Sequence, residues 1–341
     1  MPHPSTSRHG RIRDVVLAAA VAVVASATTL ALGVRAAQAE VWDMPMAYAA
    51  SNYHSENNAK FAAAVTERTG GALEIKTHPG GSLVPGGEIF GAVRRGIAPI
   101  GERLMSALGN EHPIFEIDAV PFLATSFEDS RKLYEASKDA TEQVLEDKGL
   151  KLLYAVPWPP QGLYAVRPIE SVSDMEGLKF RAYNAATSQL AEMMGAIPTK
   201  IETAELSQAF ATGVAESMIS SGSTGYDRKI WEFVDYWYDV QAWLPKNMVI
   251  VNRDAWDALD EQTQGIVLEE AAKAEEAGWA EAQRLADWYK EQLAANGMTV
   301  APPSPTLKAE FQELGAEMAA DWTERAGEMG ETVLETYESM E

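Results

Sequence analysis

Apolar and polar positions alternate in a regular order from residue 42 onward, and this order predicts strands and helices. The first four predicted elements are a strand, a helix, a strand and a helix, over residues 42–48, 55–68, 72–78 and 89–95. Such a βαβ order is typical of a parallel sheet with crossover helices. The N-terminal half of the chain is therefore predicted to be α/β.

The same pattern continues through the middle of the chain. Further predicted elements are a buried segment at 117–123, a helix over 126–147, a strand over 150–156, helices over 187–194 and 205–212, a strand over 218–221, a turn at 222–225, an aromatic-rich strand over 236–243 and a strand over 247–252. A second βα pattern begins at Val172, so the chain is expected to form a second α/β domain.

A helical pattern of unusual length follows. It covers residues 260–295 and is interrupted at Gly278. A helix of that length is about 54 Å long, more than one small domain spans, so we expect it to run along two domains. Pro302, Pro303 and Pro305 then break the chain before an amphipathic helix over 306–340.

The two βα patterns are not separated by a flexible linker, which predicts domains that exchange segments. One domain is expected to comprise residues 40–160 plus about 246–285, and the other 161–245 plus about 286–341. The predicted fold class is α/β, with two domains around a hinged cleft and a long helix that spans both. Hinged shells of this kind close around ligands.

The first 39 residues are excluded from the fold. Three arginines precede an apolar run over residues 15–32, and Ala37-Gln38-Ala39 matches a cleavage signal. A retained membrane anchor is the alternative, because the run is almost long enough to span a bilayer. The small-residue cleavage site favours removal, so the chain is predicted to be exported to the periplasm and to begin near Glu40.

Charge and composition limit the kinds of partner that the chain is expected to bind. The whole chain has a formal net charge of −22, and without the predicted signal the balance is 24 basic against 49 acidic residues, about −25. Such acidity argues against binding nucleic acid or anionic lipid. There are no cysteines, which excludes disulfides, thiolate metal sites and thiol chemistry. A cationic site for an anion would stand out against this background.

One arginine occupies such a position. Residues 177–184 place Arg181 at the end of a short apolar run, just before a predicted helix. A guanidinium holds a carboxylate by two parallel hydrogen bonds, which suggests capture of an organic acid. From the residues alone, a structural arginine that bridges two segments is an equal alternative.

Across the region that follows the signal, the chain resembles the extracytoplasmic solute-binding subunits of TRAP (tripartite ATP-independent periplasmic) transporters. The resemblance rests on short motifs in a fixed order: Pro79-Gly80-Gly81-Ser82-Leu83, Asp118 to Leu123, Arg167-Pro168-Ile169, Asp174 to Arg181, and Thr212 to Glu216. It implies a periplasmic binding protein fold, a membrane permease as partner, and a ligand that is usually an organic acid.

Individual residues of this chain match the ligand-binding positions of the family to different degrees. Arg181 matches the carboxylate-binding arginine of the family. Ser220 falls where many members have asparagine, and Gln161 lies near where the sialic-acid branch has a second arginine. Glu102 sits where several members place a ligand-facing acid. These departures keep the anchor but put the transfer of any particular sugar-acid specificity in doubt.

The other predicted ligand contacts come from loops and aromatic positions. Ser221 offers a hydroxyl beside Ser220, and Asn247 is able both to donate and to accept; an ordinary polar turn is the alternative for each. Most aromatic residues are expected in the core. Trp158 and Trp243 are the ones favoured to face the cleft, where they would accommodate an aromatic or apolar carboxylate. The remaining candidates are Tyr183 and Tyr48.

An enzyme is the alternative class, acting on a carboxylate or sugar substrate after secretion. The chain has no H-E-x-x-H motif, no nucleophile elbow and no phosphate loop. We therefore predict a binding protein that is not an enzyme and has no cofactor, no catalytic residues and no metal site, and that is a monomer. A sensory subunit that binds the same solute is a third alternative. The sequence does not name the carboxylate.

Overall fold

The computed structural model describes residues 39–340, so the predicted signal segment lies outside the described residues, apart from Ala39. The strands are β1 Glu40–Pro45, β2 Leu73–His78, β3 Ile100–Leu104, β4 Leu150–Pro157, β5 Gln161–Ala165, β6 Lys179–Ala182, β7 Ile197–Lys200, β8 Ser217–Ser221, β9 Tyr236–Tyr238, β10 Lys246–Asn252 and β11 Thr299–Ala301. The α-helices are α1 Tyr53–Arg68, α2 Ile89–Arg94, α3 Phe127–Asp147, α4 Ala185–Met193, α5 Leu206–Ala211, α6 Gly222–Asp227, α7 Arg253–Asp257, α8 Glu261–Ala295 and α9 Pro305–Glu338. Short 3₁₀ helices include η2 Met105–Leu108, η3 Pro113–Ala119 and η5 Thr203–Glu205.

A three-stranded sheet with the order β3-β10-β4 forms the centre of one core, beside the smaller β1-β2 pair. Its central strand β10 is buried on both faces. Val249 and Val251 pack with α1 and α8, whereas Met248 and Ile250 pack with α2, α3 and the C-terminal part of α9. Both pairings of β10 are antiparallel. The predicted parallel arrangement is therefore wrong for this sheet, because β10 arrives from the far half of the chain.

A six-stranded sheet with the order β11-β9-β5-β8-β6-β7 forms the second centre. Strand β6 pairs in parallel with β7 and β8, and β9 pairs in parallel with β11, as the βα pattern predicts. Strand β5 runs antiparallel to both neighbours. Helices α4 and α9 cover one apolar cluster of this sheet, and α5 covers another.

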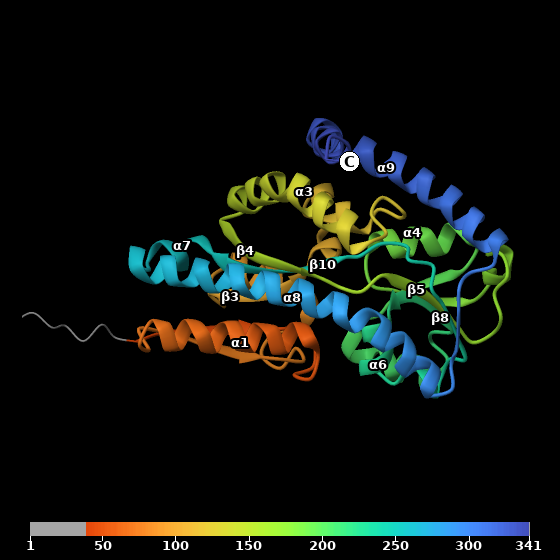
Figure 1. Ribbon diagram of the computed structural model, residues 1–341, viewed down its shortest axis with the longest axis horizontal. Coiled ribbons are helices and arrows are strands. Elements are labelled where there is room, and N and C mark those ends of the chain that lie inside the picture. Colours follow the sequence, from red (N-terminus) through yellow and green to blue (C-terminus); the bar gives the residue numbers. More distant parts are fainter. Residues whose placement is uncertain (1–38, 341) are drawn as a thin grey trace, which may run out of the picture. The chain divides into compact units, whose positions relative to one another are not determined.

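Helix α8 connects the two centres, as Figure 1 shows. It contains 35 residues and begins at the cap Asp260, whose side chain accepts a hydrogen bond from the Thr263 N–H. It packs on α1 and β4, and further along its length on α6 and β11. The predicted α/β fold with a long helix that spans both parts is confirmed.

Two chain crossings join the sheets and run side by side. Residues 158–160 lead from β4 to β5, and residues 239–245 lead from β9 to β10. The Trp158 N–H donates to the Pro245 carbonyl at 2.8 Å, and the Gln161 N–H donates to the Trp243 carbonyl at 3.0 Å. The crossings therefore form a hydrogen-bonded ribbon between the sheets.

Two local predictions are wrong. Residues 222–225 open the short helix α6 rather than a turn, and Ser221 caps it by accepting from the Thr224 N–H. Gly225 allows α6 to approach Tyr164 closely, because a Cβ there would lie 2.2 Å from the Tyr164 hydroxyl. The aromatic strand predicted over 236–243 ends at Tyr238, because the chain turns at Gln241, which has a positive φ of 50°.

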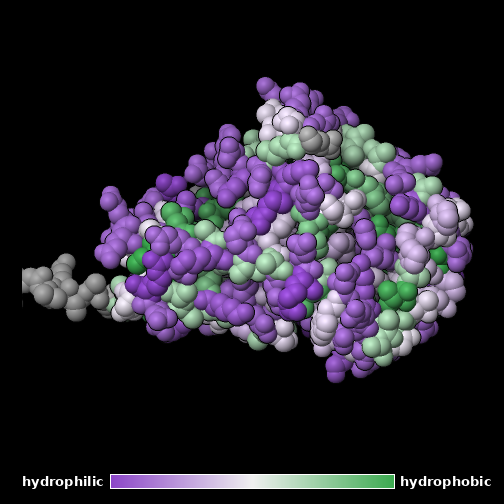
Figure 2. Space-filling view, viewed as in Figure 1, coloured by the Kyte–Doolittle hydropathy of each residue, from purple (hydrophilic) through white to green (hydrophobic). Residues whose placement is uncertain are grey.

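Polar side chains cover most of the face seen in Figure 2, as the acidic composition leads one to expect. Within residues 39–340, no helix is both long enough and apolar enough to cross a membrane.

Candidate ligand-binding cavity

A cavity with about 440 Å³ of unfilled space, including its mouth, lies where the carboxyl ends of β6, β7 and β8 meet the two crossings. Its lining comprises Tyr48, Arg103, Leu104, Ala107, Trp158, Gln161, Arg181, Tyr183, Glu202, Thr203, Ser220, Ser221, Thr224 and Pro245. The carboxyl ends of strands are where open α/β sheets bind ligands.

Arg181 is one of three charged residues that line the cavity, with Arg103 and Glu202. It lies on β6 and is only 2% exposed. Its Nε donates to the Ile201 carbonyl at 2.9 Å and its Nη2 to the Thr203 hydroxyl at 3.4 Å. No carboxylate of the described chain lies within ion-pair distance of it, and burial lowers the pKa of this guanidinium. The cavity thus holds a charged donor whose desolvation is not balanced by a counter-charge.

Tyr183 and Trp243 support that guanidinium from behind. The Arg181 Cζ lies 5.2 Å from the centre of the Tyr183 ring, a cation–π distance. The Trp243 indole donates to the Tyr183 hydroxyl at 2.9 Å. Trp243 itself is buried and does not line the cavity. Its contact with the site therefore runs through Tyr183.

Strand β8 ends in two serines that differ in what they do. The Ser221 hydroxyl caps α6 and shares a hydrogen bond with the Thr224 hydroxyl at 3.2 Å. The Ser220 hydroxyl has no hydrogen-bond partner in the described chain, although the residue is buried beside the cavity. The Ser220 hydroxyl, unlike that of Ser221, is therefore free to hydrogen-bond to a ligand.

The crossing at residues 158–160 contributes an aromatic wall, and the first residue of β5, Gln161, contributes an amide. Gln161 donates from Nε2 to the Pro159 carbonyl at 3.0 Å, which leaves its side-chain carbonyl without a partner in residues 39–340. The Trp158 ring packs against Tyr48, with ring centres 4.7 Å apart at 60°. These two rings give the cavity an apolar side.

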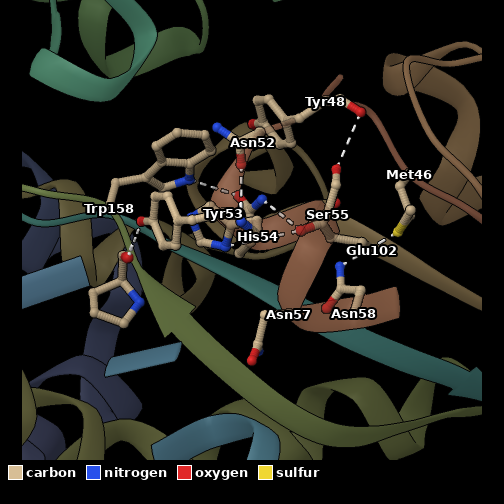
Figure 3. A network of polar contacts seen from close by, with 12 residues as sticks. Met46, Tyr48, Asn52, Tyr53, His54, Ser55, Asn57, Asn58, Glu102 and Trp158 are labelled. Atoms are coloured by element: carbon tan, nitrogen blue, oxygen red, sulfur yellow. Dashed lines mark hydrogen bonds and ion pairs between the residues drawn. The ribbon is translucent and has the colours of Figure 1, made fainter. Parts of the chain in front are cut away.

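A chain of hydrogen bonds holds Trp158 in place (Figure 3). Its indole N–H donates to the Asn247 side-chain oxygen at 2.9 Å, and the Asn247 amide donates to Glu102 at 3.0 Å. Asn247 and Glu102 are buried and do not line the cavity. Their connection to the site runs through Trp158.

Glu102 is a buried acid without a cation. Burial raises its pKa to about 7, and one of its oxygens is buried without a hydrogen-bond partner. The nearest basic group is His54, whose Nδ1 lies 3.9 Å away. Burial lowers the pKa of His54 well below its usual range, so the imidazole is neutral. This contact is therefore not an ion pair at neutral pH.

Strand β3 places Arg103 in the cavity and Glu102 behind it. Successive side chains of a strand point to opposite faces, and Glu102 shares its face with Ile100, which is buried in the core, and with Leu104, which packs in the core and also borders the cavity. Arg103 lies 3.9 Å from Glu202, and its Nε is buried without a partner. Glu102 is thus a predicted contact that lies outside the cavity, and Arg103 is a lining residue that was not predicted, although the apolar residues two positions either side of Glu102 indicate a core-facing position.

The structure brings seven of the ten predicted residues to one cavity: Arg181, Ser220, Ser221, Gln161, Trp158, Tyr183 and Tyr48. Glu102, Asn247 and Trp243 lie one layer further out. Sequence reasoning missed seven lining residues: Arg103, Leu104, Ala107, Glu202, Thr203, Thr224 and Pro245. Several of these follow short elements that the hydrophobic pattern did not reveal, such as β7 and η5. The role of every one of these residues toward a ligand stays a prediction.

Within the described part of the chain, no cluster of three or more histidine, aspartate or glutamate side chains has the geometry to hold a metal ion. The cavity lining presents two buried guanidinium groups, one carboxylate, hydroxyl and amide groups, and three aromatic rings.

An α/β fold of two sheets joined by paired crossings, with a cavity lined by buried arginines beside them, matches the fold of periplasmic solute-binding proteins. The family model described as "Bacterial extracellular solute-binding protein, family 7" (DctP) matches residues 46–325, and the chain belongs to this family. The resemblance to TRAP solute-binding subunits is thereby confirmed.

Solved structures extend this result. A TRAP solute-binding protein from an unidentified marine microbe, specific for pyroglutamate, is 50% identical and superposes with a TM-score of 0.88, over 89% of this chain and all of that one. DctP6 of Bordetella pertussis, a receptor that binds pyroglutamic acid, is 47% identical with a TM-score of 0.86, over 88% and 99%. The ectoine/5-hydroxyectoine-binding periplasmic protein UehA of Ruegeria pomeroyi is 25% identical over 92% of this chain and 94% of its own length.

Proposed function

We propose that this protein captures L-pyroglutamate in the periplasm and delivers it to a TRAP permease. The observation that carries the proposal is Arg181, a buried guanidinium without a carboxylate partner, which faces the cavity. The two pyroglutamate-binding structures described above, at 47% and 50% identity, support the choice of ligand.

The groups of pyroglutamate complement those of the cavity. Its carboxylate suits Arg181 in a bidentate pair. Its lactam N–H needs an acceptor and its lactam carbonyl a donor, and the Gln161 side-chain carbonyl and the Ser220 hydroxyl are the uncommitted groups. Its ring methylenes suit the wall made by Trp158 and Tyr48. A compact cyclic carboxylate therefore replaces the broader expectation of an aromatic or apolar acid.

Binding is tested by calorimetry on the protein without its predicted signal, with L-pyroglutamate, succinate, L-glutamate, L-proline and ectoine. We expect L-pyroglutamate to bind most tightly and to raise the unfolding midpoint, since a ligand at one hundred times its Kd adds about 2.7 kcal/mol to the free energy of unfolding. Absence of binding by L-pyroglutamate, or clear preference for another acid, would refute this ligand.

The anchor is tested by Arg181→Ala and Arg181→Lys. Loss of the buried charge pair costs about 3–5 kcal/mol, so alanine should weaken binding by more than a hundredfold. Lysine retains the charge but not the planar fork, so it should lie between alanine and the parent. Arg284→Ala, which removes an exposed arginine on α8, is the control. Equal affinity of the parent and Arg181→Ala would remove Arg181 from the site.

The competing enzyme function makes a different prediction. A binding protein returns its solute unchanged, so L-pyroglutamate incubated with the protein and then released by denaturation should be recovered in full by mass spectrometry. Appearance of L-glutamate, the product of lactam hydrolysis, would establish turnover.

Export and delivery are tested together: uptake of labelled solute by cells should require both this chain and its permease.

A further inference from the structure

A second, larger hollow lies next to the ligand cavity. It has about 1,310 Å³ of unfilled space including its open side, and it shares Arg103 and Ala107 with the ligand cavity. We call it the outer cavity. Residues of α2 and η2 line one side, and residues of α4 and β7 line the other. Nothing in the proposed function uses this hollow.

The outer cavity carries unpaired positive charge. Arg95 and Lys200 are exposed on its wall, and neither makes an ion pair within residues 39–340. Arg103 adds a third cation, with Glu202 as its one carboxylate neighbour, at 3.9 Å. Two acids also line the hollow. Glu111 is already paired with Arg94 and Lys148, at 2.7 and 3.2 Å, whereas Glu88 is exposed.

Two buried donors in this wall lack acceptors. The Arg103 Nε and the Asn184 Nδ2 make no hydrogen bond, although both residues are only 4% exposed. The Asn184 Oδ1 accepts from the Thr187 N–H at 2.8 Å and so caps α4, which fixes the amide at the start of that helix. Buried donors without partners are rare in folded proteins. Here they accompany three cations and the positive end of a nine-residue helix.

The negative charge of the rest of the molecule indicates a function for the positively charged residues of the outer cavity. A chain with net charge −22 repels an anionic solute at long range. Positive charge gathered at a cleft raises the local concentration of an anion and accelerates its association. The outer cavity provides such a positive region beside the ligand cavity, and Arg103 forms the wall common to both.

We propose that the outer cavity is a transient carboxylate-binding site through which the solute reaches the ligand cavity. Arg95, Lys200 and Asn184 receive the carboxylate, and Arg103 passes it on to Arg181. This inference rests on the proposed function, because it needs an anionic solute in the ligand cavity.

The test measures association and dissociation of L-pyroglutamate by stopped-flow tryptophan fluorescence, at several salt concentrations, for the parent and for Arg95→Gln/Lys200→Gln. We expect the association rate at low salt to fall roughly threefold to tenfold in the double variant. Its dependence on salt should weaken. The dissociation rate should fall by the same factor and the Kd should stay unchanged, because neither residue lines the ligand cavity and the solute leaves by the route through which it enters.

A second pair of substitutions, Lys60→Gln/Arg284→Gln, removes the same charge from α1 and α8, away from the outer cavity, and should leave the association rate close to that of the parent. Asn184→Ser is a further probe, because serine keeps a capping oxygen and removes the unpartnered amide N–H; it too should slow association.

The outcomes separate the two proposals. Failure of L-pyroglutamate to bind at equilibrium refutes the proposed ligand. Normal binding, with equal association rates in the parent and in Arg95→Gln/Lys200→Gln, overturns the outer cavity as an entry site. Equal slowing by both charge pairs also overturns it, since the effect would then come from net charge alone.

Discussion

Glu102 shows at the scale of one residue how burial sets a protonation state. Its carboxyl group is 1% exposed, its neighbour His54 is neutral, and it accepts hydrogen bonds from the side chains of Asn247 and Asn58. Burial without a counter-charge favours the neutral acid and raises the pKa from 4.5 to about 7. Glu102 therefore takes up or releases a proton close to neutral pH.

The stability of the protein should depend on this proton. The folded state binds it more tightly than the unfolded state, so the contribution of Glu102 is fully present below pH 4.5 and is lost as the pH rises through 7. Between pH 5 and pH 8 that loss is about 2–3 kcal/mol. Glu102→Gln, which cannot ionise, should lack this component of the pH dependence.

Urea unfolding at pH 5 and pH 8 provides the measurement, and the surface variant Glu269→Gln provides the control. Other buried acids, such as Asp118, whose pKa burial raises to about 6, are present in both proteins and cancel in the comparison. An unchanged pH dependence in Glu102→Gln would show that Glu102 is ionised in the folded protein throughout this range.

Some residues of the cavity could be predicted from the sequence, and others could not. The family resemblance indicated Arg181, and its position on a parallel strand explains why it meets Ser220 at the same sheet edge. Strand alternation separates Arg103, which lines the cavity, from Glu102, which lies behind it. Asn247 and Trp243 were placed near the cavity, but a linear pattern does not show which polar group faces a hollow and which supports it from behind.

At the scale of elements, α8 contains two glycines whose surroundings differ. A Cβ on Gly278 would lie 2.5 Å from Val156 on β4, so this glycine lets the helix and strand approach closely. A Cβ on Gly265 would meet nothing within 4 Å. The interruption seen in the sequence pattern at Gly278 is thus a packing site within a continuous helix.

The two positions predict opposite effects of alanine. Gly278→Ala overpacks the contact with β4 and should lower the free energy of unfolding by about 1–3 kcal/mol. Gly265→Ala improves helix propensity in open space and should raise it by up to about 1 kcal/mol. Chemical denaturation of the two variants decides between packing and propensity. A loss of stability in Gly265→Ala equal to that in Gly278→Ala would contradict the packing explanation.

Long periodic segments were the elements that sequence predicted well. The helices α1, α3 and α8 begin and end within two residues of their predicted bounds, because caps and glycines mark their ends. The short strands β5, β7 and β11 were missed. They have five residues or fewer, and their strand geometry depends on neighbours far along the chain.

At the scale of the whole molecule, we propose that the two sheets belong to domains that move about the paired crossings. The proposed domains remain residues 40–160 plus about 246–285, and 161–245 plus about 286–341. The ligand cavity lies between residues of both, with Arg103 from the first and Arg181 from the second. A ligand that touches both sides stabilises the closed arrangement.

Small-angle X-ray scattering tests this motion. Saturating L-pyroglutamate should reduce the radius of gyration of the parent protein, and the same concentration should leave Arg181→Ala unchanged, because that variant lacks the anchor. A parent protein with an identical radius of gyration in the presence and absence of bound solute would argue for a rigid cavity.

The order of the strands has a consequence for how such a protein changes its solute in evolution. Strands β3 and β4 come before β5 to β9, and β10 then returns to the first sheet before β11 rejoins the second. No single breakpoint divides the gene into one sheet and the other, so recombination at one site cannot exchange an intact half of the cavity. New specificities in this architecture are therefore expected to arise by substitutions at individual lining residues, with the scaffold inherited whole.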